Sequence, residues 1–132
     1  MAYQVKKKKH INKILELLDD NGKVEKRLTV DIVCDDFRNR YPAVMAEVKK
    51  AQDLINENGD QDANAVVAAQ IAVKSVFVLV FGEIQTRELL EYYENRYYEA
   101  FTDVINFVTD EVMPEIKKAV ETENKRISDI MK

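Results

Sequence analysis

Two side chains of this sequence could act as a nucleophile or carry a proton, and neither has a visible partner. His10 is the only histidine and follows a run of four lysines, where no residue pattern indicates a catalytic triad or a metal site. Cys34 is the only cysteine and precedes Asp35 and Asp36, whose negative charges disfavour the thiolate that a nucleophile needs. We therefore expect a surface histidine and a buried, unreactive cysteine.

Acidic residues near turns could bind calcium, but their spacing does not fit. A loop of the EF-hand type placed on residues 19–22 would need its first ligand at Leu17 and its final glutamate at Leu28. A second loop through residues 60–64 would have Ala65 at the position of the required glycine. Three glycines in the whole chain supply neither a phosphate loop nor a dinucleotide fingerprint. We expect no metal or cofactor, no catalytic residue and a non-enzymatic protein; a hydrolase or transferase built from scattered carboxylates is the least supported hypothesis.

The composition favours one helical domain. The chain has 132 residues, of which 46% are hydrophobic and 33% charged, and this suffices for a folded core. Three glycines and two prolines leave little material for the turns of an all-β fold. A net charge of −4 makes nucleic-acid binding unlikely as the main activity and disfavours an anionic membrane. A single cysteine and the absence of a signal-peptide pattern predict a cytoplasmic protein.

A β-hairpin is predicted near the N-terminus. Residues 24–32 alternate between apolar and polar side chains, which is typical of a strand with one buried face. The turn signal at 19–22 ends in Asn21-Gly22, a pair that accepts the positive φ angles of a tight hairpin turn. Residues 11–18 fit either a helix or a strand by spacing alone.

Three longer helices and one short helical turn are expected to follow the hairpin. The first, capped by Asp35 or Asp36, runs to Asn58-Gly59, with Pro42 inside it as a kink or an early boundary. The second begins near Asp60 or Asp62 and ends at Gly82. Its residues 65–81 are apolar on nearly every side, so we expect this segment to be the buried centre of the domain rather than a membrane span.

The last helix is longer than the domain. Thr86 is expected to cap a short helical turn, and Glu94 and Asn95 indicate a loop between this turn and the last helix. Residues 97–131 would extend roughly 50 Å as a helix, so either Pro114 bends the helix back or its end projects beyond the body. The predicted fold is mainly α, a bundle of about four helices with an N-terminal β-hairpin. Its parts are a flexible basic N-terminus (1–10), the hairpin (11–33), a helical body (35–120) and a charged tail (121–132).

An apolar stripe on the last helix is the candidate partner-binding surface. Its residues recur every three or four positions, and the tyrosines beside them are residue types enriched at protein interfaces. The alternative is that the stripe closes the core of the same chain, with the tyrosines packed half-buried beside a hinge. Partner binding would then rest on the helix beyond Pro114 and on the edge of the hairpin. The candidate residues are Tyr97, Tyr98, Phe101, Ile105, Val108, Val112 and Ile116.

One stretch resembles a known family. Phe81-Gly82-Glu83 precedes Thr86 and Leu89-Leu90, and a tyrosine-rich turn then leads into residues 101–108. This order, after a hairpin, resembles the small tail assembly chaperones of long-tailed bacteriophages and prophages, although Ile84 stands where their motif has glycine. The resemblance implies a virion morphogenesis factor that binds the tape-measure and tail-tube proteins, self-associates and leaves the finished particle. It also favours a strand over residues 11–18 and implies a bacterial host cytoplasm.

A regulatory protein that binds nucleic acid or another protein is the alternative hypothesis. Lys6 to Lys9, together with Arg38 and Arg40, could form a local basic patch despite the acidic whole. Such a patch would neutralise phosphates, and its binding would weaken with salt. The sequence alone leaves both hypotheses open.

Overall fold

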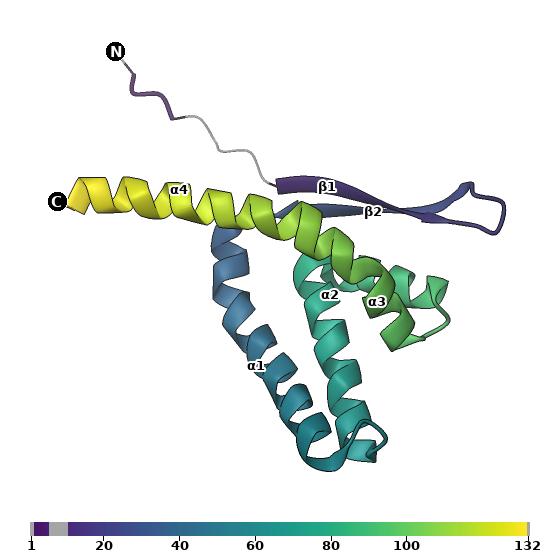
Figure 1. Ribbon diagram of the computed structural model, residues 1–132. Helices are drawn as coiled ribbons and strands as arrows, with labels where there is room; N and C mark the ends of the chain where they lie inside the picture. The colour runs from purple at the N-terminus through teal and green to yellow at the C-terminus, as the bar shows by residue number, and fades with distance from the viewer. Residues whose placement is uncertain (1, 6–10, 132) are drawn as a thin grey trace.

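The computed structural model describes residues 2–5 and 11–131, apart from the side chain of Cys34. The predictions made for Lys6 to Lys9, His10 and the cysteine thiol therefore lie outside the described part of the chain. The fold is mainly helical with an N-terminal β-hairpin, as predicted (Figure 1). In chain order the elements are β1 (Ile11–Leu18), β2 (Val24–Ile32), α1 (Cys34–Asn58), α2 (Ala63–Tyr92), α3 (Tyr97–Phe107), a π-helical turn (Val108–Val112) and α4 (Met113–Met131).

The two strands form an antiparallel hairpin, so residues 11–18 are a strand rather than a helix. Ile11 lies opposite Ile32, and the register shifts once, between Leu17 and Leu18. The connecting loop is held by Asp19, whose carboxylate accepts the backbone N–H groups of residues 21 and 23 at 2.9 Å each. In this loop only Gly22 has a positive φ, of 78°. The turn lies where the sequence predicts it, but glycine alone adopts the left-handed conformation.

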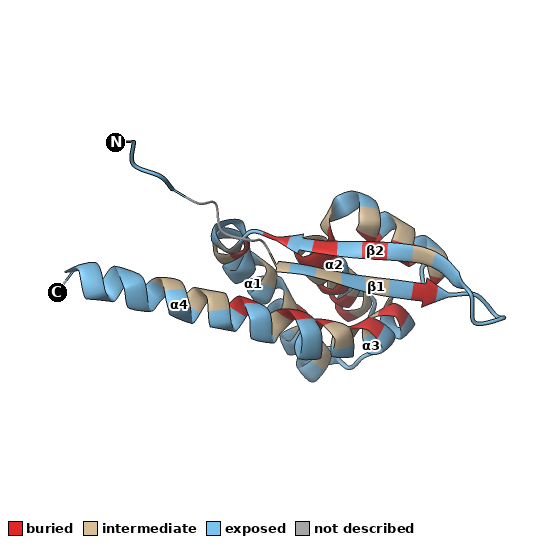
Figure 2. Cartoon of the chain, turned by 90° about the horizontal axis from the view of Figure 1, so that it is seen from above, coloured by how far each residue is buried: buried red, intermediate tan, exposed pale blue. Residues whose placement is uncertain are grey.

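Strand alternation directs one face of the hairpin into the core. Leu17, Leu28, Val30 and Ile32 are buried, whereas the residues between them are exposed. The buried face lies over α2 and the α3–α4 segment, as Figure 2 shows from above. A two-stranded ribbon is marginal alone, so this helical layer is what stabilises it. The main core continues through Phe77, Phe81, Leu89, Leu90, Tyr93, Val104, Val108, Val112 and Ile116.

Helix α1 and the first part of α2, residues 63–81, form an antiparallel pair that we call the arm. The arm extends away from the sheet (Figure 1). Its buried seam is a separate cluster of small residues, Ala51, Ala69 and Ala72, flanked by half-buried Val48 and Ile55. Small side chains allow close approach of the two helices but bury little apolar surface.

A side-chain cap fixes the start of α2 but not the start of α1. Asp62 caps α2, because its carboxylate accepts the backbone N–H groups of Asn64 at 3.1 Å and Ala65 at 3.2 Å. Helix α1 instead begins at Cys34, with no side-chain capping bond, and the two predicted caps lie in its first turn. There they still favour the positive end of the helix dipole. Helix α1 includes Pro42, so the proline is not a helix boundary, and the helix ends before Gly59 as predicted.

Helix α2 breaks at Gly82 and then resumes. Gly82 has φ 80° and ψ 169°, a left-handed conformation that favours glycine. The predicted end of the second helix is therefore a kink. The helix continues to Tyr92, and Thr86 caps nothing: its side chain is buried within the resumed helix. Glu94 and Asn95 form the predicted loop, both with positive φ.

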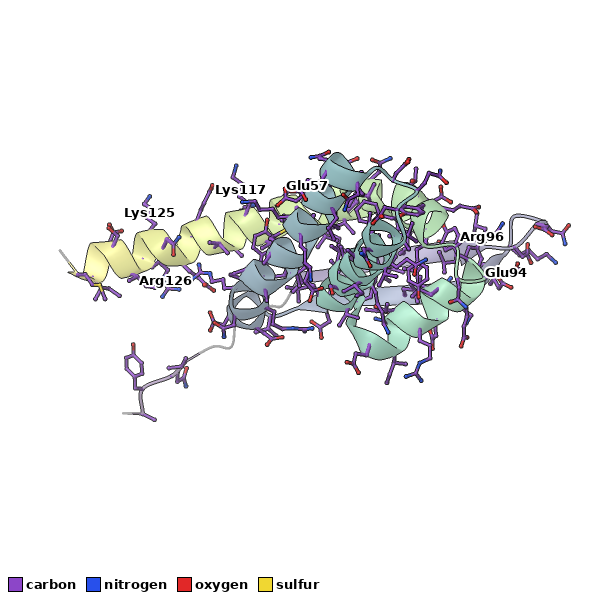
Figure 3. All side chains as sticks on the ribbon, turned by 90° about the horizontal axis from the view of Figure 1, so that it is seen from below. Glu57, Glu94, Arg96, Lys117, Lys125 and Arg126 are labelled. Atoms are coloured by element: carbon purple, nitrogen blue, oxygen red, sulfur yellow. The ribbon has the colours of Figure 1, made fainter. Side chains whose placement is uncertain are left out.

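The last helix projects, and Pro114 does not fold it back. The π-helical turn before Pro114 is closed by a hydrogen bond from the Met113 N–H to the Val108 carbonyl, five residues earlier. This wider turn accommodates a proline that lacks an N–H donor. Arg38 of α1 contacts Glu123 and Asn124, and the end of α4 beyond them projects from the body (Figures 1 and 2). On α4, Lys117 and Lys125 point to one side and Arg126 to the opposite side (Figure 3). The predicted charged tail is helical through Met131.

Candidate functional site

The predicted stripe on the last helix lies mostly inside the molecule. Val108, Val112 and Ile116 are 4%, 0% and 3% exposed, so they offer no surface to a partner and close the core, as the alternative interpretation expects. Phe101 is half-buried, with its ring 6.2 Å from that of Phe77. The half-buried members Tyr97 and Ile105 pack against the same core, and Tyr98 alone of the seven is exposed.

An uncovered apolar face lies instead on α2. Val67 and Ile71 are 55% and 51% exposed, although they lie in the most apolar segment of the chain. With 100° per residue, they share a face with Lys74 and Val78, and this face points away from the alanines that contact α1. The expectation that residues 65–81 are buried on all sides is therefore wrong for this face, because the arm has two helices and no third layer of the described chain covers it.

This face leads into a hollow of about 440 Å³ beside the kink. Val78, Leu90 and Tyr97 provide apolar lining, and charged side chains surround it, an arrangement typical of protein-docking surfaces. We call the face and the hollow together the α2 groove. Its residues are Val67, Ile71, Lys74, Val78, Glu83, Arg87, Leu90, Glu91, Asn95 and Tyr97.

The groove contains two cations without an ion-pair partner. Among the described residues, Lys74 and Arg87 have no carboxylate within 4.0 Å, whereas Glu91 lies 3.9 Å from Lys26 across the groove edge. By contrast, residues 53–62 at the tip of the arm contain four carboxylates and no basic side chain. Figure 3 labels one of the four, Glu57. The arm tip is therefore acidic, whereas the groove holds the cations Lys74 and Arg87 beside the carboxylates of Glu83 and Glu91.

The chain exposes more surface than a compact monomer of its mass. A monomer of 15.3 kDa exposes roughly 7,100 Å², whereas this chain exposes 9730 Å². Even with roughly 1,700 Å² allowed for the first ten residues, a surplus of about 900 Å² remains. The two-helix arm and the projecting end of α4 are the extended parts that account for it (Figure 1).

The tyrosines fasten the turn between α2 and α3 to the hairpin. The Tyr92 hydroxyl donates to the Leu18 carbonyl, and the Tyr93 hydroxyl donates to the Asp103 carboxylate at 3.0 Å. Burial raises the pKa of Tyr93 above its ordinary value, and the hydrogen bond to Asp103 and its negative charge raise it further. These two tyrosines therefore hold the structure together, as the half-buried alternative expects.

The free edge of β2 is partly closed by one side chain, Gln85. Its amide oxygen accepts the Thr29 N–H at 2.7 Å, and its amide nitrogen donates to the Thr29 carbonyl at 2.6 Å. The same nitrogen donates to the Phe81 carbonyl at 2.8 Å, next to the kink. Gln85 thus imitates a neighbouring strand at one residue and joins the hairpin to the break in α2.

The alternative sites are not assembled in the described part of the chain. Arg38 is used internally, because its guanidinium donates to the Val120 carbonyl and lies 3.4 Å from the Glu123 carboxylate. Arg40 lies 3.8 Å from Asp36. Within residues 2–5 and 11–131, no three His, Cys, Asp or Glu side chains gather as metal ligands would.

Helix α2 is long and apolar enough to cross a membrane, and 39% of its most apolar 18-residue stretch is buried inside the structure.

A family model described as "Protein of unknown function (DUF1186)" matches residues 1–130. The chain belongs to the DUF1186 family. Neither the curated proteins nor the solved structures contain a significant match.

Sequence reasoning missed most of the α2 groove but not its last member. Tyr97 is one of the seven candidate partner-binding residues of the last helix, and it also lines the hollow. Val67 and Ile71 were assigned to the core because hydrophobicity indicates burial without indicating what provides it. Lys74 was the available signal: a charged residue in the middle of an apolar helix marks the face that has no intramolecular cover.

Proposed function

We propose that this DUF1186 protein is a non-enzymatic assembly chaperone that binds other protein chains through the α2 groove. The observation that supports this proposal most is the exposure of Val67 and Ile71 on one face of α2. Contiguous apolar surface that a protein leaves exposed marks an interaction site. The polar rim around the hollow is the other part of a protein-docking site.

The partners proposed are those of a phage tail assembly chaperone, namely the tape-measure and tail-tube proteins. This part of the proposal rests on the resemblance. The Phe81-Gly82-Glu83 stretch that carries it lies at the kink of α2, beside the hollow, where a sequence motif would affect the shape of the groove. A long helical partner needs its apolar segments covered before assembly, and a helix-lined groove suits that task.

The test is co-expression with a tape-measure protein encoded in the same gene neighbourhood. The expected result is a soluble complex that co-purifies, while the tape-measure protein alone precipitates. An Ile71→Asp variant should lose the complex, and an Ile130→Asp variant, changed at an 81% exposed position on α4, should keep it. If the partner stays insoluble with the unaltered chaperone, or if both variants keep the complex, the proposal is wrong.

A further inference from the structure

We infer that the free protein is a two-fold symmetric dimer in which the α2 grooves of two copies face each other antiparallel. The inference rests on the proposed function for its biological meaning, since the dimer would cover the groove until a client chain takes it. The dimer itself follows from uncovered area, residue register and charge.

The uncovered area is sufficient for one interface. A standard protein interface takes about 800 Å² from each partner, and the surplus of exposed surface on this chain is about 900 Å². The projecting end of α4 contributes to this surplus, but charged side chains point from several of its sides (Figure 3). The exposed face of α2 has Lys74 as its one charge between residues 63 and 81, so it is the better candidate for burial.

Register favours the antiparallel arrangement. If Val67 of one copy faces Ile71 of the second copy, symmetry also places Ile71 against Val67, so these two exposed residues cover each other twice. Lys74 is then level with Asn64 of the second copy. A parallel pair would instead place each Lys74 beside its equivalent, and like charges in contact repel.

Charge complementarity points the same way. In the antiparallel register Lys74 lies within about one helical turn of Asp60 and Asp62 of the second copy. The acidic arm tip of each copy then lies level with Val78, at the end of the other copy's hollow that Lys74 and Val78 line. Lys74 and Arg87 have no ion-pair partner among the described residues of their own chain. Glu83 also lines the hollow and opposes this attraction, so the expected gain comes mainly from Lys74.

The experiment measures the mass of the isolated chain in solution. Sedimentation equilibrium at concentrations up to roughly 100 μM should give twice 15.3 kDa for the unaltered protein. Ile71→Asp should weaken the dimer by roughly 100-fold or more, because it places a charge in both symmetric contacts. Ile130→Asp is the matched control and should leave the dimer unchanged. Circular dichroism should be the same for all three, because both positions are exposed.

A charge-reversal pair tests the register itself. Lys74→Glu and Asp60→Lys should each weaken the dimer by roughly tenfold, and the double variant should recover most of that loss. Recovery supports the antiparallel pairing. Independent, additive losses would show that the two residues do not face each other and would overturn the register.

Three other outcomes overturn the dimer. These are a monomer at every concentration, a dimer insensitive to Ile71→Asp, and a dimer that Ile130→Asp abolishes, which would assign the contact to α4. The client-binding experiment above separates the two proposals. A monomer that still solubilises a client contradicts the dimer alone, and a dimer that fails to solubilise one contradicts the proposed function alone.

Discussion

Replacing Gln85 with methionine should destabilise the protein through three lost hydrogen bonds. The amide contacts both backbone groups of Thr29 and the Phe81 carbonyl at 2.6 to 2.8 Å. Methionine keeps the length and helix propensity of the side chain and removes only the amide. Each such bond contributes about 0.5–1.5 kcal/mol. Because water can partly replace the bonds at this exposed edge, we expect a loss near the lower end, about 2 kcal/mol in total.

The assay is urea denaturation followed by circular dichroism, with Gln52→Met as the matched control. Gln52 is an exposed residue of α1 for which the described chain offers no hydrogen-bond partner. A loss of about 2 kcal/mol corresponds to a decrease in Tm of roughly 6 to 10 °C for a domain of this size. Gln85→Glu should be worse than methionine at neutral pH, since a carboxylate would face two carbonyl oxygens. The reasoning is refuted if Gln85→Met and Gln52→Met agree within about 0.5 kcal/mol, the usual spread of surface substitutions.

Three further substitutions examine the interior. The pKa of Tyr93 is raised, so its contribution to the free energy of unfolding is complete below about pH 10, the usual pKa of tyrosine, and decreases above it because the unfolded chain ionises first. Urea titrations between pH 9 and 11 should therefore show a smaller loss of stability for Tyr93→Phe than for the unaltered protein. Thr86→Val should raise stability by about 1 kcal/mol in the same assay, because the Thr86 hydroxyl is buried without a partner; a decrease would indicate that the hydroxyl is satisfied. Val112→Asp should unfold the chain at neutral pH, since the side chain is fully buried and an unpaired carboxylate there costs several kcal/mol; a folded variant would contradict the assignment of Val112 to the core.

The sequence predicted the fold wherever the signal was local. Alternation over residues 24–32 located β2, and Asn58-Gly59 located the end of α1. Thr86 was misassigned because a residue that often caps helices can also sit inside one that restarts after a kink. Pro114 was expected either to bend the last helix back or to leave its end projecting. The outcome depended on the π-helical turn before it, for which the sequence has no recognisable pattern.

The candidate site was harder to predict because it depends on which apolar residues the fold leaves uncovered. The seven stripe residues and the α2 face have similar composition and periodicity, yet Val112 is fully buried and Ile71 half exposed. The difference arises from the number of layers around each helix. That number is a property of the tertiary arrangement, and a helical pattern does not encode it.

The alanine seam of the arm and the main core are separate apolar clusters, and this has a consequence for hydrogen exchange. A cluster of three alanines with half-buried neighbours resists opening less than a core that contains Phe77 and Leu28. The outer part of the arm, between its tip and Val73, should therefore open as a unit of its own, with amide protection that falls off sharply from Val73 toward the tip. Its slowest-exchanging amides would report the stability of the arm alone, while those of the main core would report the free energy of global unfolding.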